Sequence, residues 1–229
     1  QPGADGSHAT LLHVEEALLR CNTELADFLR DGVCVRHAVI RRPTLRFARL
    51  PDGTWSGSRL WPTPNLSETP PDVTVENGTI EVLDLTKTPP STLTFRDVNL
   101  TIKNRPPDAE HPGGKPVRVL EGTLRGDHMG RVEIRGEGDP GGADWRFTGT
   151  VHDLDLSSEL HQALPAPLAE QIALLAVFRG RIQVDFDVQS DSTAPHGYRF
   201  DVKGRITEGR FDDRRLPDQF RNIRGSIQA

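Results

Sequence analysis

The sequence predicts a mainly β fold: a curved, mostly antiparallel sheet with an N-terminal amphipathic helix and a short helical pair near residues 157–176. Three observations lead to this prediction. Short runs of alternating apolar and polar residues recur between glycine- and proline-rich turn signals. In two other segments the pattern is typical of an amphipathic or capped helix instead of a strand. Gly occurs 21 times and Pro 18 times, whereas Met and Tyr occur once each, which favours many strands joined by turns over a helical bundle.

The N-terminal third contains a predicted tail, a helix and two strands. Residues 1–10 are expected to be a flexible tail. From there the apolar positions recur every three or four residues, which predicts a helix over residues 11–30 that covers an edge of the sheet through Leu11, Val14, Leu18, Leu25 and Phe28. Strands are expected at 33–40 and 43–50, followed by a turn at Pro51-Asp52-Gly53. Cys21 and Cys34 leave two alternatives open, a disulfide or two free thiols.

The stretch from Asp72 to Lys103 is interpreted as a three-stranded meander. Val73 and Val75 alternate with polar residues on one side of Asn77-Gly78, and the alternation resumes after it, so a tight hairpin turn is predicted there. In the third strand the apolar parity changes near Arg96-Asp97. Because a strand has a period of two, this change predicts a β-bulge.

Further strands are expected at 117–124, 130–136 and 145–151, so that strands fill residues 33–151. The helical pair is expected as an insertion within 157–176, with Ser157-Ser158 as the cap of its first helix and Pro167 at the start of its second. Strands then return over 180–227, at 180–188, 198–206, 209–211 and 223–227. Glycine is expected to relieve crowding where strands bend, in a loose repeat at Gly122, Gly149, Gly180, Gly204 and Gly225.

Composition narrows the class of protein. The net charge of −5 gives no electrostatic argument for nucleic-acid binding. The longest aliphatic run, around Ile172 to Phe178, is far shorter than the roughly 20 residues of a spanning helix. Residues 1–10 lack the basic and apolar regions of a signal peptide. We expect the chain to be a fragment of a longer protein whose membrane anchor lies outside it.

No catalytic, cofactor-binding or metal-binding residue is predicted. Aspartates alternate with apolar residues at Asp153-x-Asp155 and Asp185-x-Asp187, which is typical of the solvated face of a one-sided strand, and Asp212-Asp213 is interpreted in the same way. The histidines show no helical i, i+4 pair. No Gly-x-Ser-x-Gly elbow and no glycine-rich phosphate loop is present, so we expect a protein that is not an enzyme.

The apolar strand faces have two interpretations. Either they fill the closed core of a sandwich or barrel, or they line an open trough wide enough for acyl chains. The candidate lining residues are Leu45, Phe47, Val73, Val75, Ile80, Val82, Leu93, Phe95, Val98, Leu100, Ile102, Phe186 and Phe200.

Five segments together resemble the AsmA-like family of bacterial envelope proteins, of the TamB and YhdP type: 40–55, 73–84, 93–102, 147–157 and 200–227. The resemblance covers the chain from about Ile40 to its end. It implies an open, taco-like β-groove with an apolar concave face that carries phospholipid or other acyl lipid between membranes. It also implies a periplasmic location, an N-terminal tether to the inner membrane, a role in outer-membrane biogenesis and envelope protein partners. The alternatives are a secreted β-sandwich adhesin or carbohydrate-binding module with a closed core and, third, a polysaccharide-degrading β-solenoid enzyme.

Overall fold

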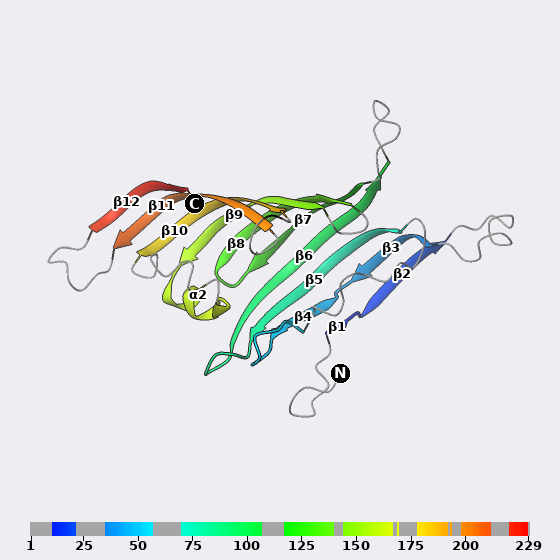
Figure 1. The fold of residues 1–229 in the computed structure, drawn as a ribbon, viewed down its shortest axis with the longest axis horizontal. Helices are drawn as coiled ribbons and strands as arrows, with labels where there is room; N and C mark the ends of the chain where they lie inside the picture. The colour runs from blue at the N-terminus through cyan, green and yellow to red at the C-terminus, as the bar shows by residue number, and fades with distance from the viewer. Residues whose placement is uncertain are drawn as a thin grey trace.

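The computed structural model describes residues 11–21, 35–56, 70–106, 117–139, 144–166, 169, 178–191, 193, 198–211 and 220–228. Within these ranges the protein is a single curved sheet with one short helix (Figure 1). The strands are β1 (Leu12–His13), β2 (Glu16–Cys21), β3 (Val35–Arg41), β4 (Thr44–Arg49), β5 (Asp72–Asp84), β6 (Ser91–Arg105), β7 (Val117–Gly126), β8 (Met129–Gly138), β9 (Trp145–Leu156), β10 (Phe178–Ser190), β11 (Tyr198–Phe211) and β12 (Phe220–Gln228). The helix α2 spans Ser158–Ala163.

The sheet is mixed, mostly antiparallel and not closed. From β5 to β12 each strand pairs with the next in antiparallel order. Before β5 the order changes, because β3 and β4 both run parallel to β5, one beside each half of it. β2 pairs with β3 and β1 with β4, both antiparallel. No pairing joins the β1 and β2 edge to β12 within the described residues, so the predicted curved antiparallel sheet is confirmed as an open one.

The N-terminal segment corrects one prediction. Its described part, residues 11–21, contains strands β1 and β2 where a helix was expected; residues 22–30 lie outside the described residues. Pairing with β3 and β4 supplies backbone hydrogen bonds such as that from Arg46 N–H to the Leu11 carbonyl, 2.8 Å. Because tertiary pairing outweighs a weak helical pattern, the segment forms the edge of the sheet itself. Cys21 at the end of β2 carries a free thiol.

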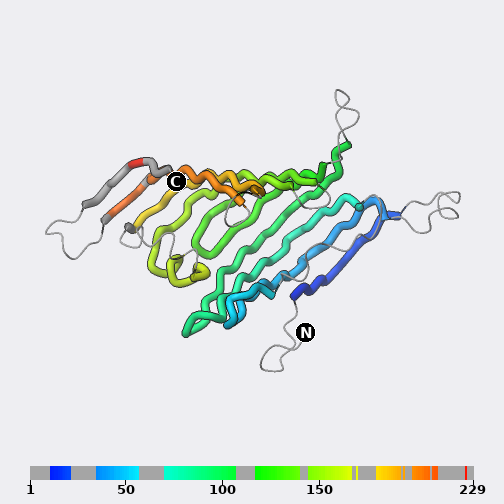
Figure 2. The backbone as a smooth tube through the Cα atoms, viewed as in Figure 1, coloured from blue at the N-terminus to red at the C-terminus, as the bar shows by residue number. Residues whose placement is uncertain are grey.

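The predicted hairpin at Asn77-Gly78 is also wrong. β5 is one continuous strand through these residues and runs across the sheet from one of its ends to the other (Figure 2). Asn77 does adopt a positive φ, 53°, but it does so in a β-bulge. The bulge predicted near Arg96-Asp97 is confirmed: Asp97 has φ 51° and the register of β6 shifts beside it.

The two bulges lie side by side and compensate. Between the pairs Val75–Leu100 and Gly78–Val98 the extra residue is in β5, and in the next interval it is in β6, so the original register returns. Arg42, between β3 and β4, has φ 48° at the same level. Bulges bend strands and increase their twist. These irregularities therefore form one transverse line of bending, which we call the crease.

The crease is closely packed. A Cβ on Gly78 would lie 3.2 Å from Pro43 Cγ and 3.4 Å from Val98 Cβ, so glycine lets these two residues approach each other. Val98 is only 2% exposed, the lowest value of any described apolar residue. Pro43, Gly78 and Val98 are therefore the residues that pack together at the crease.

The first helix of the predicted pair is confirmed. The Ser157 side chain accepts a hydrogen bond from Leu160 N–H at 3.2 Å and caps α2. Leu160 packs with Leu156, Ile182 and Ile206. The second predicted helix lies mostly outside the described residues, although Ala169 N–H donates to the Pro165 carbonyl.

The strands predicted at 33–40 and 43–50 correspond to β3 and β4, which have shorter bounds, and residues 33–34 lie outside the described residues. The other predicted strands are confirmed with longer bounds, except that 198–206 and 209–211 form the single bulged strand β11. The turn at Pro51-Asp52-Gly53 is confirmed as well, with Gly53 at φ 83°. Asp212-Asp213 lies outside the described residues. None of the helices in the described ranges combines the length and apolarity that crossing a bilayer requires.

Candidate functional site: the apolar face of the sheet

All candidate lining residues lie on one face of the sheet. The register places Val82 beside Phe47 on one side and beside Leu93 on the other, and the same rule relates the remaining pairs across β4, β5 and β6. The compensating bulges preserve this order across the crease, so Val98, Leu100 and Ile102 share the face of Phe95. Continuing the register through β9, β10 and β11 places Phe186 and Phe200 on it too. We call this surface the apolar face.

The apolar face is larger than the sequence prediction. Register and the period of two add residues from every strand between β7 and β11: Leu120, Val132, Ile134, Trp145, Phe147, Val151, Ile182, Val184, Val188, Val202 and Ile206. Their strands were predicted, but the pairing between strands was not. Applying the parity of the known positions to each neighbouring strand would have identified them.

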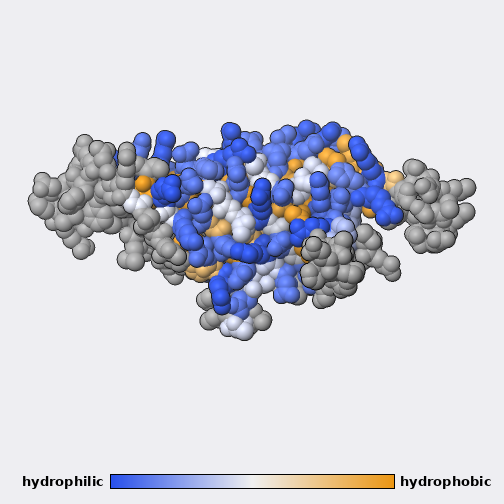
Figure 3. Space-filling model, turned by 90° about the horizontal axis from the view of Figure 1, so that it is seen from above, coloured by the Kyte–Doolittle hydropathy of each residue, from blue (hydrophilic) through white to orange (hydrophobic). Residues whose placement is uncertain are grey.

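Most of the apolar face is only half-buried. Leu93 and Val98 are buried, Phe200 is 48% exposed, and the other candidate residues are intermediate. In a closed sandwich a second sheet would bury such residues. In the view of Figure 3, hydrophobic residues near the middle of the molecule are bordered by hydrophilic side chains. The closed-core arrangement is therefore not the one adopted by the described residues.

Glycines let large side chains lie flat on this face. A Cβ on Gly136 would lie 2.5 Å from two ring atoms of Phe147, and one on Gly149 would lie 2.6 Å from Phe186 Cζ. Leu100 covers Gly122 in the same way. The expectation that Gly122 and Gly149 relieve crowding is confirmed, whereas Gly225 has open space around its Cβ position. Side chains that lie along the sheet leave the volume above it free.

The opposite face is polar and carries ion pairs between neighbouring strands. Arg41 pairs with Glu16 and Glu76, and Arg46 pairs with Glu81. Arg146 pairs with Asp187; the hydrogen bond from its guanidinium holds the pKa of Asp187 below the ordinary range of an aspartate.

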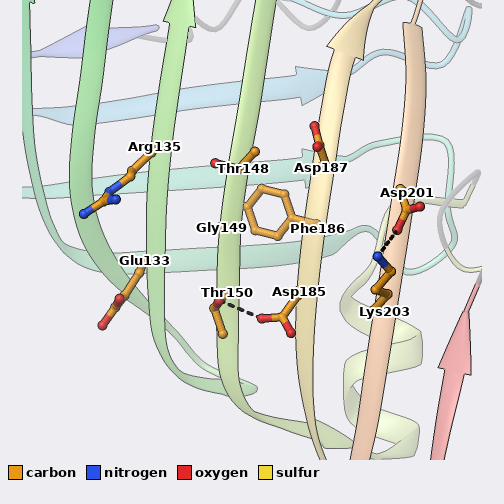
Figure 4. Close-up of a pocket in the computed structure, with 10 residues that line it drawn as sticks. All are labelled: Glu133, Arg135, Thr148, Gly149, Thr150, Asp185, Phe186, Asp187, Asp201 and Lys203. Carbon is orange, nitrogen blue, oxygen red and sulfur yellow. Dashed lines mark hydrogen bonds and ion pairs between the residues drawn. The ribbon is translucent and has the colours of Figure 1, made fainter.

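A depression of about 490 Å³ is lined mostly by side chains of this polar face, together with Gly149 and Phe186 (Figure 4). Its charged lining is largely paired: Thr150 donates to Asp185 at 2.7 Å, and Lys203 lies 3.7 Å from Asp201. Asp185 and Asp187 thus lie on the polar face, as their alternation predicted. Among the described residues no three His, Cys, Asp or Glu side chains are grouped closely enough to hold a metal ion.

The apolar face is concave at the lower rim, which is the edge that contains the β5–β6 turn and α2 in Figure 1. α2 packs on the apolar face of β9, β10 and β11, yet it also contacts β6. In Figure 4, α2 appears behind β11, and strands from the N-terminal half cross behind β9 and β10. The sheet therefore curves around the side on which its apolar residues lie.

A buried carboxylate at the end of β5 connects this strand to the segment that follows α2. Asp84, 1% exposed, accepts hydrogen bonds from the Thr86 hydroxyl at 2.5 Å and from Ala166 N–H at 2.8 Å, and Arg49 lies 3.6 Å away. Burial acts to raise the pKa of Asp84, but these hydrogen bonds and the Arg49 charge outweigh it and hold the pKa below its ordinary value. Lys87 adds bonds to the carbonyls of Gln162 and Leu164. No sequence signal indicated this link, because its members are distant in the chain.

The fold and the site define an open β-sheet protein with one apolar concave face and one ion-paired face. No protein-family model and no curated protein sequence matches the chain.

Proposed function

We propose that this chain is a non-enzymatic module of bacterial envelope biogenesis whose apolar concave face binds or conducts lipid acyl chains between membranes. The observation that carries the proposal is the half-buried apolar face, continuous from β4 to β11 on a sheet that does not close. A contiguous apolar surface that the rest of the described structure leaves partly uncovered is typical of a binding surface.

The chemistry of the face suits an acyl chain better than a polar ligand. Its central rows are aliphatic and aromatic, and Phe147 and Phe186 lie flat over glycines. Acyl chains gain about 0.8 kcal/mol for each methylene removed from water and need no directional partner. A smooth apolar surface therefore provides affinity without fixing the position of the chain, which is the property that lipid movement along a groove requires.

The resemblance to the AsmA-like family supports the remaining parts of the proposal. It suggests a taco-like groove, a periplasmic location, a tether to the inner membrane and a role in outer-membrane biogenesis. Other envelope proteins are the partners it suggests. The adhesin or carbohydrate-binding alternative assumed a closed core, and no observation favours it.

The experiment is native mass spectrometry of the protein purified from a bacterial envelope without detergent exchange. We expect protein carrying the mass of a phospholipid, and saturable uptake of a fluorescent fatty-acid analogue by delipidated protein. A fatty acid with a photoreactive tail should cross-link to apolar-face residues and spare the ion-paired face. Protein that purifies free of lipid and takes up no analogue would reject the proposed function.

A further inference from the structure

Arg118 is a cation on the apolar face; Arg49, at the lower rim, is another but lies 3.6 Å from Asp84. At the upper rim, opposite α2, the register places Asn104, Arg118, Gly138 and Trp145 in one row across β6, β7, β8 and β9. No register shift separates Arg118 from Leu120 in β7, so its side chain begins on the same face as Leu120.

The guanidinium of Arg118 lacks an anionic partner within the described residues. Its Nη2 donates to the Pro71 carbonyl at 3.2 Å, while its Nε is buried and has no acceptor. The neighbouring Asp72 carboxylate accepts instead from Asn104, through the backbone N–H at 3.0 Å and the side-chain amide at 3.3 Å. This differs from the polar face, where Arg41, Arg46 and Arg146 all pair with carboxylates. A buried charged donor without an acceptor is costly, which indicates that a ligand supplies one.

The apolar surface that such a ligand would cover begins beside Arg118. Gly138 is the next position in the row and Trp145 follows it, close enough that a Cβ on Gly138 would lie 3.1 Å from Trp145 Cβ. Toward the crease, β7 continues with Leu120, Gly122 and Leu124. At ~3.3 Å per residue the strand from Arg118 to Leu124 spans about 20 Å. One leaflet of a bilayer core is roughly 15 Å thick, half of the whole hydrocarbon core.

We propose that Arg118 binds the phosphate of a phospholipid whose acyl chains lie on the apolar face between the upper rim and the crease. A guanidinium suits this role because its planar donors match two phosphate oxygens at once. The inference rests on the proposed function and deepens it by assigning the headgroup end of the lipid. A free phosphate offers the same oxygens, but only a lipid also fills the apolar surface around this arginine.

The test compares two lipids with equal chains in native mass spectrometry of delipidated protein: a dioleoyl phosphatidylglycerol and the neutral dioleoylglycerol. Arg118→Gln removes the charge, and Arg118→Lys keeps the charge without the planar donors. Arg125→Gln is the matched control, because Arg125 lies on the same strand and on the opposite face. Glycerol 3-phosphate serves as the phosphate source without acyl chains, and circular dichroism checks the fold.

Arg118→Gln should bind phosphatidylglycerol about tenfold more weakly while its dioleoylglycerol binding stays unchanged, as expected for the loss of a charge-assisted hydrogen bond. Arg118→Lys should be intermediate and Arg125→Gln unchanged. If Arg118→Gln bound both lipids equally more weakly, or both as tightly as the parent does, the inference about Arg118 would be overturned. Lipid binding by the parent protein would still support the proposed function. Saturation by glycerol 3-phosphate alone, as tight as by the phospholipid, would assign the site to free phosphate. Failure of the parent protein to bind either lipid would reject the proposed function as well.

Discussion

The side chain of Asn99 on β6 accepts a hydrogen bond of 3.0 Å from the backbone N–H of Asn77 on β5. Its amide also donates to the Asp97 carbonyl at 2.8 Å. Asn77 and Asp97 are the two positive-φ residues of the paired bulges, so one side chain satisfies backbone groups that the interrupted ladder leaves without a strand partner. The crease therefore depends on this asparagine as well as on Gly78.

Replacing Asn99 tests this link. Asn99→Ala should lower the free energy of unfolding by about 0.5–1.5 kcal/mol, the usual net value of a hydrogen bond that water can partly replace. Urea denaturation measures the change. Thr101→Ala, on the same strand and the same polar face, is the control and should cost less. If Asn99→Ala were as stable as the parent, water would replace the hydrogen bonds to the Asn77 N–H and the Asp97 carbonyl at no cost.

The backbone at Asn77 gives a second prediction. Asn77→Gly should be close to neutral, whereas Asn77→Val should destabilise by about 1–2 kcal/mol, because a β-branched residue is strained at positive φ. Thermal unfolding of the two variants measures the difference. If valine were tolerated as well as glycine, residue 77 would not hold the φ of 53° found here.

Gly136 tests whether rings lie flat on the apolar face. Gly136→Ala places a Cβ 2.5 Å from the Phe147 ring, so we expect a loss of about 1–3 kcal/mol from overpacking. Adding Phe147→Leu should recover part of that loss, and a double-mutant cycle in urea measures the coupling. Gly225→Ala is the control, since nothing lies within 4 Å of its Cβ position. Strictly additive effects at 136 and 147 would contradict the contact.

Asp84 predicts a pH-dependent stability. Folding lowers its pKa, so the carboxylate stabilises the folded state above its unfolded pKa, about 3.9, and this contribution is lost as the pH falls through the lower folded-state value. Asp84→Asn should therefore cost about 1.5–3 kcal/mol at pH 7 and progressively less below pH ~4. Urea unfolding of the variant and the parent at pH 7 and again below pH ~4 measures this difference in stability. A cost that does not change with pH would show that the charge is irrelevant.

A pair of substitutions on β6 distinguishes a position that lines an open groove from one that is packed in a core. Leu100 lies on the half-buried part of the apolar face, so we expect Leu100→Asp to give a folded protein that no longer binds phospholipid or takes up the fatty-acid analogue. Val98→Asp places the same charge where the side chain is 2% exposed and should prevent folding, at a cost of several kcal/mol.

Two controls accompany that pair. Thr101→Asp and Arg146→Ala change the polar face, and Arg146→Ala should change the stability little because the ion pair is exposed and screened by water. Both should keep lipid binding. A folded Leu100→Asp variant with undiminished lipid binding would remove residue 100 from the groove.

The sequence by itself determined which residues share a face. Alternation is local, so Val73 could be grouped with Val75, and Ile80 with Val82, without knowing their neighbours, and the change of parity at Arg96-Asp97 identified the bulge in β6. That the two groups of β5 share a face depends on the bulge at Asn77. The cap at Ser157 was equally local, since its partner Leu160 lies three residues away.

Tertiary structure decided the rest, because several local patterns have two solutions. The positive φ of Asn77 fits a hairpin turn and a bulge equally, and the bulge is fixed by Pro43, between β3 and β4, and by Asn99 on β6. The Leu11–Leu18 spacing suited a helix, but the free edge of β3 and β4 offered it backbone partners. The parallel pairing with β5 and the link from Asp84 to Ala166 join residues far apart in the chain. Whether the apolar face is covered depends on such long-range contacts, which a pattern with a period of two does not encode.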